Sequence, residues 1–308
     1  MRQCAYVYCR AFVGDSGPCS VCGHPEDPLQ LRDPAFFLGA MASVQGLPKR
    51  MLDMHQILPA YPNIERYQLM AMDQLGIERA LLQSAPAQAT SLQGNAGLAN
   101  VATEHPHRFW ASQFTDPQLD TALDDLQRFA DAGFRVVKLL PVTGWAADDP
   151  KLKPFWAAMQ DLGLTAMVHT GFFTARHKEE EAAADAYMNS RFADPLHFDK
   201  PCRQFPELRV ILCHTGGALW FERGAQMVTQ HEHVWGDVSG FGIFALQRLL
   251  RGVAVDWSKL FWGNDSPPYA YPLNLRLLLS ALDNAGANQL VGPLLHDNGA
   301  RFAQVALD

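Results

Sequence analysis

The chain has no apolar run that approaches the roughly 18 residues needed to span a bilayer, which argues against a transmembrane protein. Its first ten residues also lack an apolar stretch of the signal-peptide type, so we expect a cytoplasmic protein. Positive charge is not in excess, because 25 basic and 32 acidic residues give a net charge of −7. This balance disfavours nucleic acids and anionic membrane surfaces as partners.

Cysteine is scarce, and most of it is confined to one end of the chain. Cys202 and Cys213 are isolated, and Cys213 lies in an apolar run, where we interpret it as a small buried hydrophobic residue. The other four cysteines fall within the first 22 residues: Cys4, Cys9, Cys19 and Cys22. The Cys-Ser-Val-Cys-Gly stretch at 19–23 resembles a zinc-ribbon knuckle, which predicts a structural Zn²⁺ site of four thiolates. Reduced, unpaired cysteines on a tail are the alternative.

The distribution of turn residues and apolar runs divides the chain into three parts. Residues 1–28 form the predicted zinc-ribbon-like module, residues 29–49 a linker, and residues 50–308 a series of alternating strand and helix signals. Eight apolar runs read as strands, at 51–58, 77–85, 108–114, 134–141, 164–169, 208–214, 234–239 and 260–265. Each precedes a helical pattern, which predicts a (β/α)8 TIM barrel with a small N-terminal extension. A doubly wound open sheet is the structural alternative.

Residues that commonly bind metal ions end four of these strands. The first run ends in Asp53 and His55, and later runs end in His169, His214 and Asp265. Residues two apart in a strand point to the same side, so we expect the carboxylate of Asp53 and the imidazole of His55 to project together into a solvent-filled mouth. Because the carboxyl ends of barrel strands meet at one mouth, these residues predict a single site.

Four stretches resemble the amidohydrolase superfamily, in particular the branch that contains aminocarboxymuconate-semialdehyde decarboxylase. They are LDMHQILP, LTAMVHTG, RVILCHTGG and LFWGNDSPP, and they occur in the order and at the spacing of that family. RFWASQFTDP, AGFRVVKLLPV and LLHDNGARF add to the resemblance, which covers the chain from about residue 50 to its end. It implies a metal-dependent barrel enzyme.

The first stretch departs from the family, because much of the superfamily has His-x-His where this chain has Asp53-x-His55. In one alignment a metal ligand has been lost. In the other, which we favour, Asp53 and His55 replace the histidine pair, as in the dihydroxybenzoate and resorcylate decarboxylases that this branch resembles. We therefore expect Asp53, His55, His169 and Asp265 to hold the metal. Two imidazoles and two carboxylates suit Zn²⁺ or Mn²⁺.

The resemblance also implies roles beside the metal. It places His214 next to the ion as an acid/base group, with a fifth ligand as its alternative role. Lys138, at the end of the fourth strand, is expected to neutralise a substrate carboxylate, or else to be carboxylated and bridge two metals. Aromatic residues beyond strands four and five, Trp145, Phe172 and Phe173, are candidates for a pocket wall or for rim anchors. The charged insertion at 171–199 is a solvated helix or a lid.

The predicted function is hydrolysis of an amide or ester bond in a small carboxylated substrate, in which Asp265 takes the proton of the attacking water and His214 stabilises the developing oxyanion. Non-oxidative decarboxylation of a small hydroxy-aromatic or muconate-like acid is the second hypothesis, favoured by the acidic-x-His motif. A non-catalytic binding barrel is the third. The branch also contains metal-free lactonases, so metal content distinguishes these hypotheses only in part. A homodimer is one assembly that this fold could form, and the sequence does not decide between it and a monomer.

Overall fold

The computed structural model describes residues 2–3, 12–13, 34–60, 62–86, 92–172, 188–239 and 243–308. The four N-terminal cysteines lie outside these residues, as do Phe173 and most of the charged insertion. The strands β1 (Arg2–Gln3) and β2 (Phe12–Val13) pair antiparallel. None of the helices that the structure describes combines the length and the apolar character needed to cross a bilayer.

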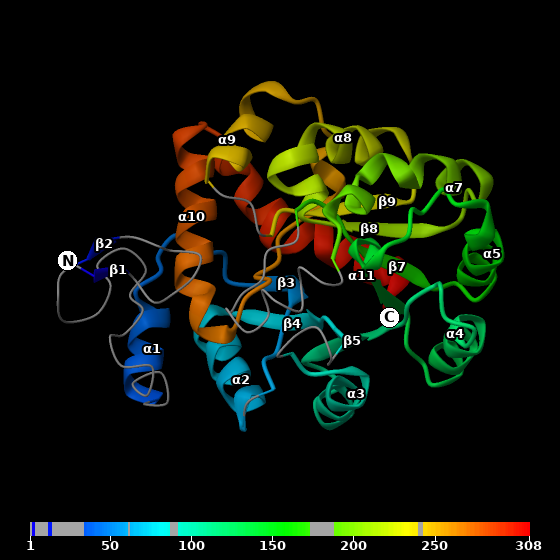
Figure 1. Cartoon of the computed structure of the whole chain (residues 1–308). Helices are drawn as coiled ribbons and strands as arrows, with labels where there is room; N and C mark the ends of the chain where they lie inside the picture. Colours follow the sequence, from blue (N-terminus) through cyan, green and yellow to red (C-terminus); the bar gives the residue numbers. More distant parts are fainter. Residues whose placement is uncertain are drawn as a thin grey trace.

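Eight parallel strands form one sheet in strict sequence order, as the alternating pattern predicts (Figure 1). Their side chains are almost entirely buried, which explains why the runs are continuously apolar rather than alternating. The strands are β3 (Met51–Gln56), β4 (Ile77–Leu82), β5 (Phe109–Phe114), β6 (Val136–Leu139), β7 (Thr165–His169), β8 (Arg209–Cys213), β9 (Val234–Asp237) and β10 (Leu260–Phe261).

The first and last strands are joined beyond the end of β10, which nearly closes the sheet into a barrel. The Met54 N–H donates to the Trp262 carbonyl at 3.1 Å, and the Asp265 N–H donates to the His55 carbonyl at 2.7 Å. Gly263 permits this approach, because a Cβ atom there would lie 2.3 Å from the Cβ of His55. The predicted TIM barrel is confirmed.

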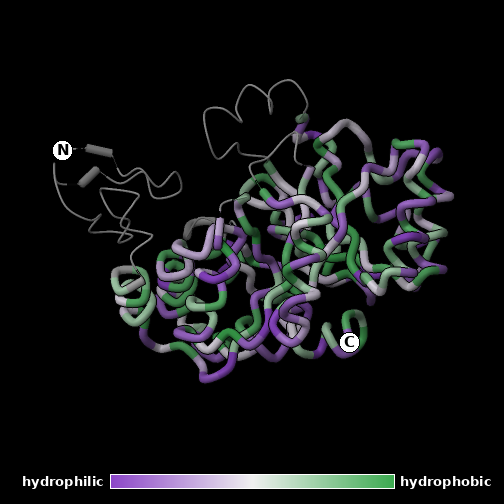
Figure 2. The backbone as a smooth tube through the Cα atoms, turned by 90° about the horizontal axis from the view of Figure 1, so that it is seen from below, coloured by the Kyte–Doolittle hydropathy of each residue, from purple (hydrophilic) through white to green (hydrophobic). Residues whose placement is uncertain are grey.

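Helices surround the barrel, and Figure 2 shows hydrophilic and hydrophobic stretches alternating along them. In α4, for example, Leu126 and Phe129 are buried while Asp124 and Arg128 are exposed. The helices that follow the strands are α2 (Ile64–Leu75), α3 (Asn95–Glu104), α4 (Ala122–Asp131), α5 (Lys153–Asp161), α7 (Asp199–Gln204), α8 (Gly217–Gln230), α9 (Ile243–Gly252), α10 (Tyr271–Asn284) and α11 (Asn298–Ala306).

Two segments differ from the sequence prediction. The residue pattern at 290–306 predicts one helix, but Pro293–Asp297 forms a π-helical turn before α11 begins. The predicted linker contains a helix, α1 (Pro34–Ala42), whose Phe37 and Met41 are buried. The Phe37 ring packs edge-on against Tyr67 of α2 at 5.4 Å between centroids. Apolar surface on this segment is therefore used to cover the barrel.

The apolar interior is arranged in two layers. One lies between the strands and the surrounding helices, and it contains most of the buried side chains. The other fills the barrel itself, where Leu81, Met167 and Ile211 meet Phe302 of α11. This apolar filling closes the barrel at one end. The polar side chains at the carboxyl ends of the strands gather at the other end.

Candidate active site

Three side chains from distant strands meet at the carboxyl end of the barrel. His55 Nε2 lies 3.3 Å from Asp265 Oδ1, and His214 Nε2 lies 3.8 Å from Asp265 Oδ2. The possible ligand atoms of these three residues all lie within 4.8 Å of one another, a spacing at which one ion could contact them together. The ring of His169 lies 5.1 Å from that of His214. The predicted convergence of strand ends is thus present in the structure.

The backbone at this site is strained. Among the described residues, four that are not glycine have a positive φ, and three of them are His214, Thr215 and Asp265, at 63°, 45° and 43°. Such angles are costly for residues with a side chain and persist where the surrounding structure enforces them. The surrounding structure therefore holds the imidazole of His214 and the carboxylate of Asp265 in fixed directions.

Asp237 belongs to this site, although the sequence analysis did not select it. It is the last residue of β9, it is fully buried, and its Oδ2 lies 2.8 Å from His55 Nδ1. The carboxylate contacts the ring of His55 on the side away from Asp265. The rule that found the other residues would also have found Asp237, because Val234–Asp237 is a strand that ends in a carboxylate.

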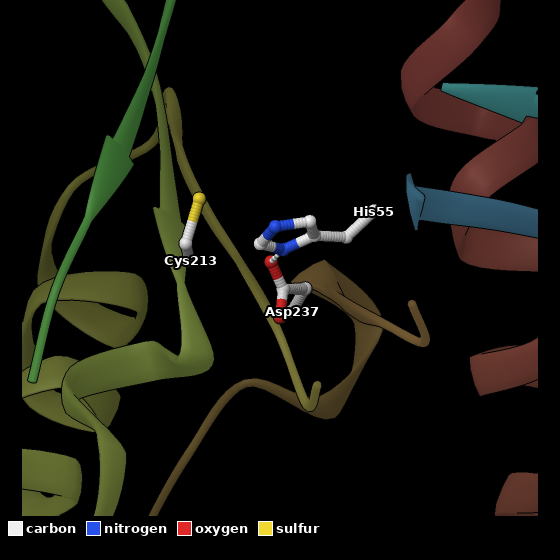
Figure 3. A group of neighbouring side chains, drawn as sticks. All are labelled: His55, Cys213 and Asp237. Carbon is white, nitrogen blue, oxygen red and sulfur yellow. Dashed lines mark hydrogen bonds and ion pairs between the residues drawn. The ribbon is translucent and has the colours of Figure 1, made fainter. Parts of the chain in front are cut away.

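Cys213 and Lys138 lie at the inner wall of the barrel beneath the imidazoles. Figure 3 shows Cys213 and Asp237 around the ring of His55. The possible ligand atoms of these three residues lie within 4.8 Å of one another. The Lys138 ammonium donates to Cys213 Sγ at 3.0 Å, and both side chains are buried. Cys213 is therefore buried as predicted, but its sulfur atom has a polar contact with a residue of the predicted substrate pocket.

The surroundings shift the pKa values of the three imidazoles in different directions. Burial alone would lower the pKa of His55, but the carboxylates of Asp265 and Asp237 outweigh it and raise that pKa well above its ordinary value. Burial lowers the pKa of His169 far below its ordinary value, helped by the charge of His214. Burial also lowers the pKa of His214, against the opposing effect of Asp265. Both shifts favour the neutral imidazole, the form in which a histidine binds a metal ion or accepts a proton.

The structure does not bring Asp53 into this group. The Tyr271 hydroxyl of α10 donates to Asp53 Oδ2 at 2.6 Å, and the N–H groups of His55 and Asn264 donate to Asp53 Oδ1 at 3.0 and 3.1 Å. The pairing of β3 with β4 shifts register between Asp53 and Gln56, the stretch that contains His55. Asp53 and His55 consequently have different surroundings, and the role of Asp53 as a ligand stays a prediction.

The setting of Asp53 also differs from the expected solvent-filled mouth, since its side chain is fully buried. Burial raises its pKa from 3.8 to about 6, although the hydrogen bond from Tyr271 opposes the rise. A chain of buried polar groups continues outward from it: Gln68 Nε2 donates to the Tyr271 oxygen at 2.7 Å, and Gln56 Nε2 donates to Gln68 Oε1 at 2.6 Å. This network was not predicted, because its members lie on three separate elements.

The remaining predicted residues have varied positions. Trp145 is buried and packs against Trp156 at 6.2 Å between ring centroids, so it anchors the rim rather than lining an open wall. Phe172 is 62% exposed, and Phe173 lies outside the described residues. Arg191, from the end of the charged insertion, stacks over the ring of Phe192 at 4.5 Å. The predicted aromatic wall is therefore represented here only by a buried anchor and one exposed ring.

Comparisons with known proteins agree with this architecture. Residues 51–302 match the family model described as Amidohydrolase. No curated protein sequence matches the chain.

Several solved structures share the fold. One is 2,6-dihydroxybenzoate decarboxylase from Rhizobium, at 17% identity and a TM-score of 0.57, over 83% of this chain and 99% of that one. Another is a putative 2-pyrone-4,6-dicarboxylic acid hydrolase from Pseudomonas putida, at 17% identity and a TM-score of 0.56, over 85% of this chain and 100% of that one. A third is a dihydroxybenzoic acid decarboxylase from Polaromonas with bound manganese and the inhibitor 2-nitroresorcinol. Its sequence identity is 15% and its TM-score 0.56, over 84% of this chain and 97% of that one. At these identities the likeness establishes the fold.

Proposed function

Because the chain belongs to the amidohydrolase family, we propose that it is a metal-dependent hydrolase that cleaves an amide or ester bond in a small carboxylated substrate. The observation that carries this proposal is the meeting of His55, His214 and Asp265 at the mouth of the barrel, with ligand atoms within 4.8 Å of one another. A carboxylate between two imidazoles can both contact a cation and accept a proton.

The donor set fits a divalent cation of the zinc or manganese type. His55, His169 and Asp265 would hold it, since two imidazoles and a carboxylate are ligands that suit both ions. Asp53 is the proposed fourth ligand, which would require its carboxylate to leave part of its present hydrogen bonding. When bound, the cation would supply a Lewis acid that polarises a substrate oxygen.

The protein's own groups account for the proton transfers. Asp265 accepts the proton of the attacking water, and its carboxylate lies close enough to both imidazoles to be held in one orientation. Asp265 passes this proton to His214 Nε2, which lies 3.8 Å from its Oδ2. The imidazolium then donates a hydrogen bond to the oxygen on which negative charge develops, and finally its proton to the leaving group. Lys138, buried at the inner wall, offers its positive charge to the carboxylate of the substrate.

Decarboxylation is the second candidate. Several of the solved structures with this fold are decarboxylases of hydroxybenzoic acids, and the buried ammonium of Lys138 would hold a carboxylate equally well in that reaction. Asp265 or His214 would then protonate the carbon that loses CO₂. We rank it second because Asp53, whose motif favours this reaction, lies outside the cluster of His55, His214 and Asp265.

One experiment separates these functions. The full chain, loaded with Zn²⁺ or Mn²⁺, is incubated in ¹⁸O-labelled water with two panels: carboxylated lactones, esters and amides, and hydroxybenzoic acids. Incorporation of ¹⁸O into a new carboxylate supports hydrolysis. Release of CO₂ without incorporation would replace the proposal with decarboxylation, and metal binding without either product would indicate a binding barrel.

Replacing Lys138 with Met tests its role in substrate binding. A charge-assisted hydrogen bond to a carboxylate contributes about 1.5–3 kcal/mol, so we expect kcat/KM to fall roughly 10- to 100-fold with the metal content unchanged. Lys200→Met, at an exposed position, serves as the control. Loss of metal from the Lys138 variant would instead identify Lys138 as a bridging ligand.

The N-terminal cysteines carry a separate proposal, namely one structural Zn²⁺ bound by Cys4, Cys9, Cys19 and Cys22. Its support is the Cys-x-x-Cys-Gly spacing of the second pair. A variant with all four cysteines changed to Ser should contain one zinc fewer per chain than the wild type, measured by elemental analysis. Equal zinc contents would reject the assignment.

A further inference from the structure

The buried side chain of Asp237 accepts hydrogen bonds through both of its oxygens at the mouth of the barrel. Its Oδ2 lies 2.8 Å from His55 Nδ1. Its Oδ1 accepts the backbone N–H groups of His214 at 3.0 Å and of Ser239 at 2.9 Å, and it also accepts the Ser239 hydroxyl. One buried carboxylate thus contacts a residue of β3, His55, and residues that follow β8 and β9, His214 and Ser239.

These contacts fix which nitrogen of His55 carries a proton. A carboxylate can only accept hydrogen bonds, so His55 Nδ1 must donate to Asp237 Oδ2. The Ser239 oxygen, 3.1 Å from the same nitrogen, has already directed its proton to Asp237 and is also an acceptor. His55 Nε2 is therefore the nitrogen that faces Asp265, at 3.3 Å, and that a cation would contact in place of a proton.

The turn from Asp237 to Ser239 also fixes which nitrogen of His214 carries a proton. Its Nδ1 lies 3.1 Å from the backbone carbonyl of Ser239, which can only accept, so this nitrogen also carries a proton. Its Nε2 then points toward Asp265, at 3.8 Å. Because Asp237 Oδ1 holds the N–H groups of both His214 and Ser239, it sets the distance between that carbonyl and the imidazole.

Asp237 is poorly suited to be a metal ligand itself, although it lies near His55 and Cys213 (Figure 3). Both of its oxygens are already occupied by donors. The sulfur of Cys213 is contacted by the Lys138 ammonium at 3.0 Å, whose positive charge would repel a cation at that position. Asp237 is therefore better explained as a hydrogen-bond acceptor that orients the imidazole of His55 than as a metal ligand.

We propose that Asp237 is a positioning residue that keeps the proton of His55 on Nδ1, so that both His55 and His214 present Nε2 to the reaction centre. This inference rests on the proposed metal-dependent function. Carboxylates that accept the second N–H of a metal-binding histidine fix the orientation of its ring and raise its basicity.

Asp237→Asn tests this role with little change in volume. The N–H groups of His214 and Ser239 require the amide oxygen, which turns the amide NH₂ toward His55 Nδ1. His55 should then lose the Nδ1 proton and carry it on Nε2. We expect ¹⁵N NMR of histidine-labelled, metal-free protein to show this change, since zinc on Nε2 would exclude a proton there. The zinc affinity, measured by chelator competition, should fall roughly 10- to 100-fold.

His214 is the internal reference, since its Nδ1 proton should persist in the variant. Asp148→Asn is the matched control, because Asp148 contacts His197 Nδ1 at 3.1 Å on the surface, and it should leave both nitrogens of His55 and the zinc affinity unchanged. An unprotonated Nδ1 on His55 in the wild type would overturn the proposal without any variant. So would an Asp237→Asn protein that keeps the Nδ1 proton and full zinc affinity. None of these measurements requires turnover, so they are independent of the reaction assigned.

Discussion

Replacing Asp265 with Asn is expected to reduce kcat/KM by about 10²- to 10⁴-fold while the barrel stays folded. An amide cannot accept a proton from water, and it is a weaker ligand than a carboxylate. The fold should tolerate the change, because Asn has the same size and adopts the positive φ of 43° at this position more readily than most residues.

Turnover, metal content and the thermal midpoint of unfolding should be measured on the same preparations of wild type and Asp265→Asn. A variant that keeps its metal but loses turnover would assign proton transfer to Asp265, whereas loss of both would assign it mainly as a ligand. Asp297→Asn is the control, since that carboxylate pairs with His296 on the surface at 2.9 Å. Unchanged turnover in Asp265→Asn would remove the residue from the mechanism.

Replacing Asp53 with Ala is expected to lower the free energy of unfolding by about 3–5 kcal/mol. The change leaves three buried donors, the Tyr271 hydroxyl and the N–H groups of His55 and Asn264, without their acceptor. Each unsatisfied buried donor costs about 1–3 kcal/mol. Denaturant unfolding of the metal-free protein measures this loss, and a change within 1 kcal/mol would contradict the observed burial.

The pH dependence of this effect has a definite sign. The pKa of Asp53 is raised in the folded chain from 3.8 to about 6, mainly by burial. Its contribution to stability is therefore fully present below about pH 4 and is lost as the pH rises through 6, a difference on the order of 3 kcal/mol. Asp53→Asn, which does not titrate, should lack this component when its unfolding is compared with that of the wild type across the range.

Metal affinity measured on the folded fraction of Asp53→Ala separates the two roles of this carboxylate. Unchanged affinity would leave Asp53 as a structural acceptor for Tyr271 and remove it from the ligand set. Reduced affinity would show that the carboxylate reaches the cation when one is bound, which would restore the alignment with the acidic-x-His decarboxylases.

The sequence by itself determined the barrel and most of its site. Continuous apolar runs separated by helical patterns predict parallel strands buried on both faces. Once the strands are parallel, their carboxyl ends must lie together, so His55, His169, His214 and Asp265 could be assigned to one mouth without any distance between them being known. Local periodicity and chain direction suffice for this conclusion.

Only the tertiary structure decided how the individual side chains are used. Asp53 lies in a strand with a register shift, and it accepts a hydrogen bond from Tyr271, 218 residues away. Asp237 acquires its role from His55, 182 residues away, and Lys138 meets Cys213 across 75 residues. Such contacts depend on how packed elements approach one another, and a single polar residue carries no local signal of the partner that it will meet. The sequence therefore specifies which residues reach the mouth of the barrel, while packing determines which of them touch.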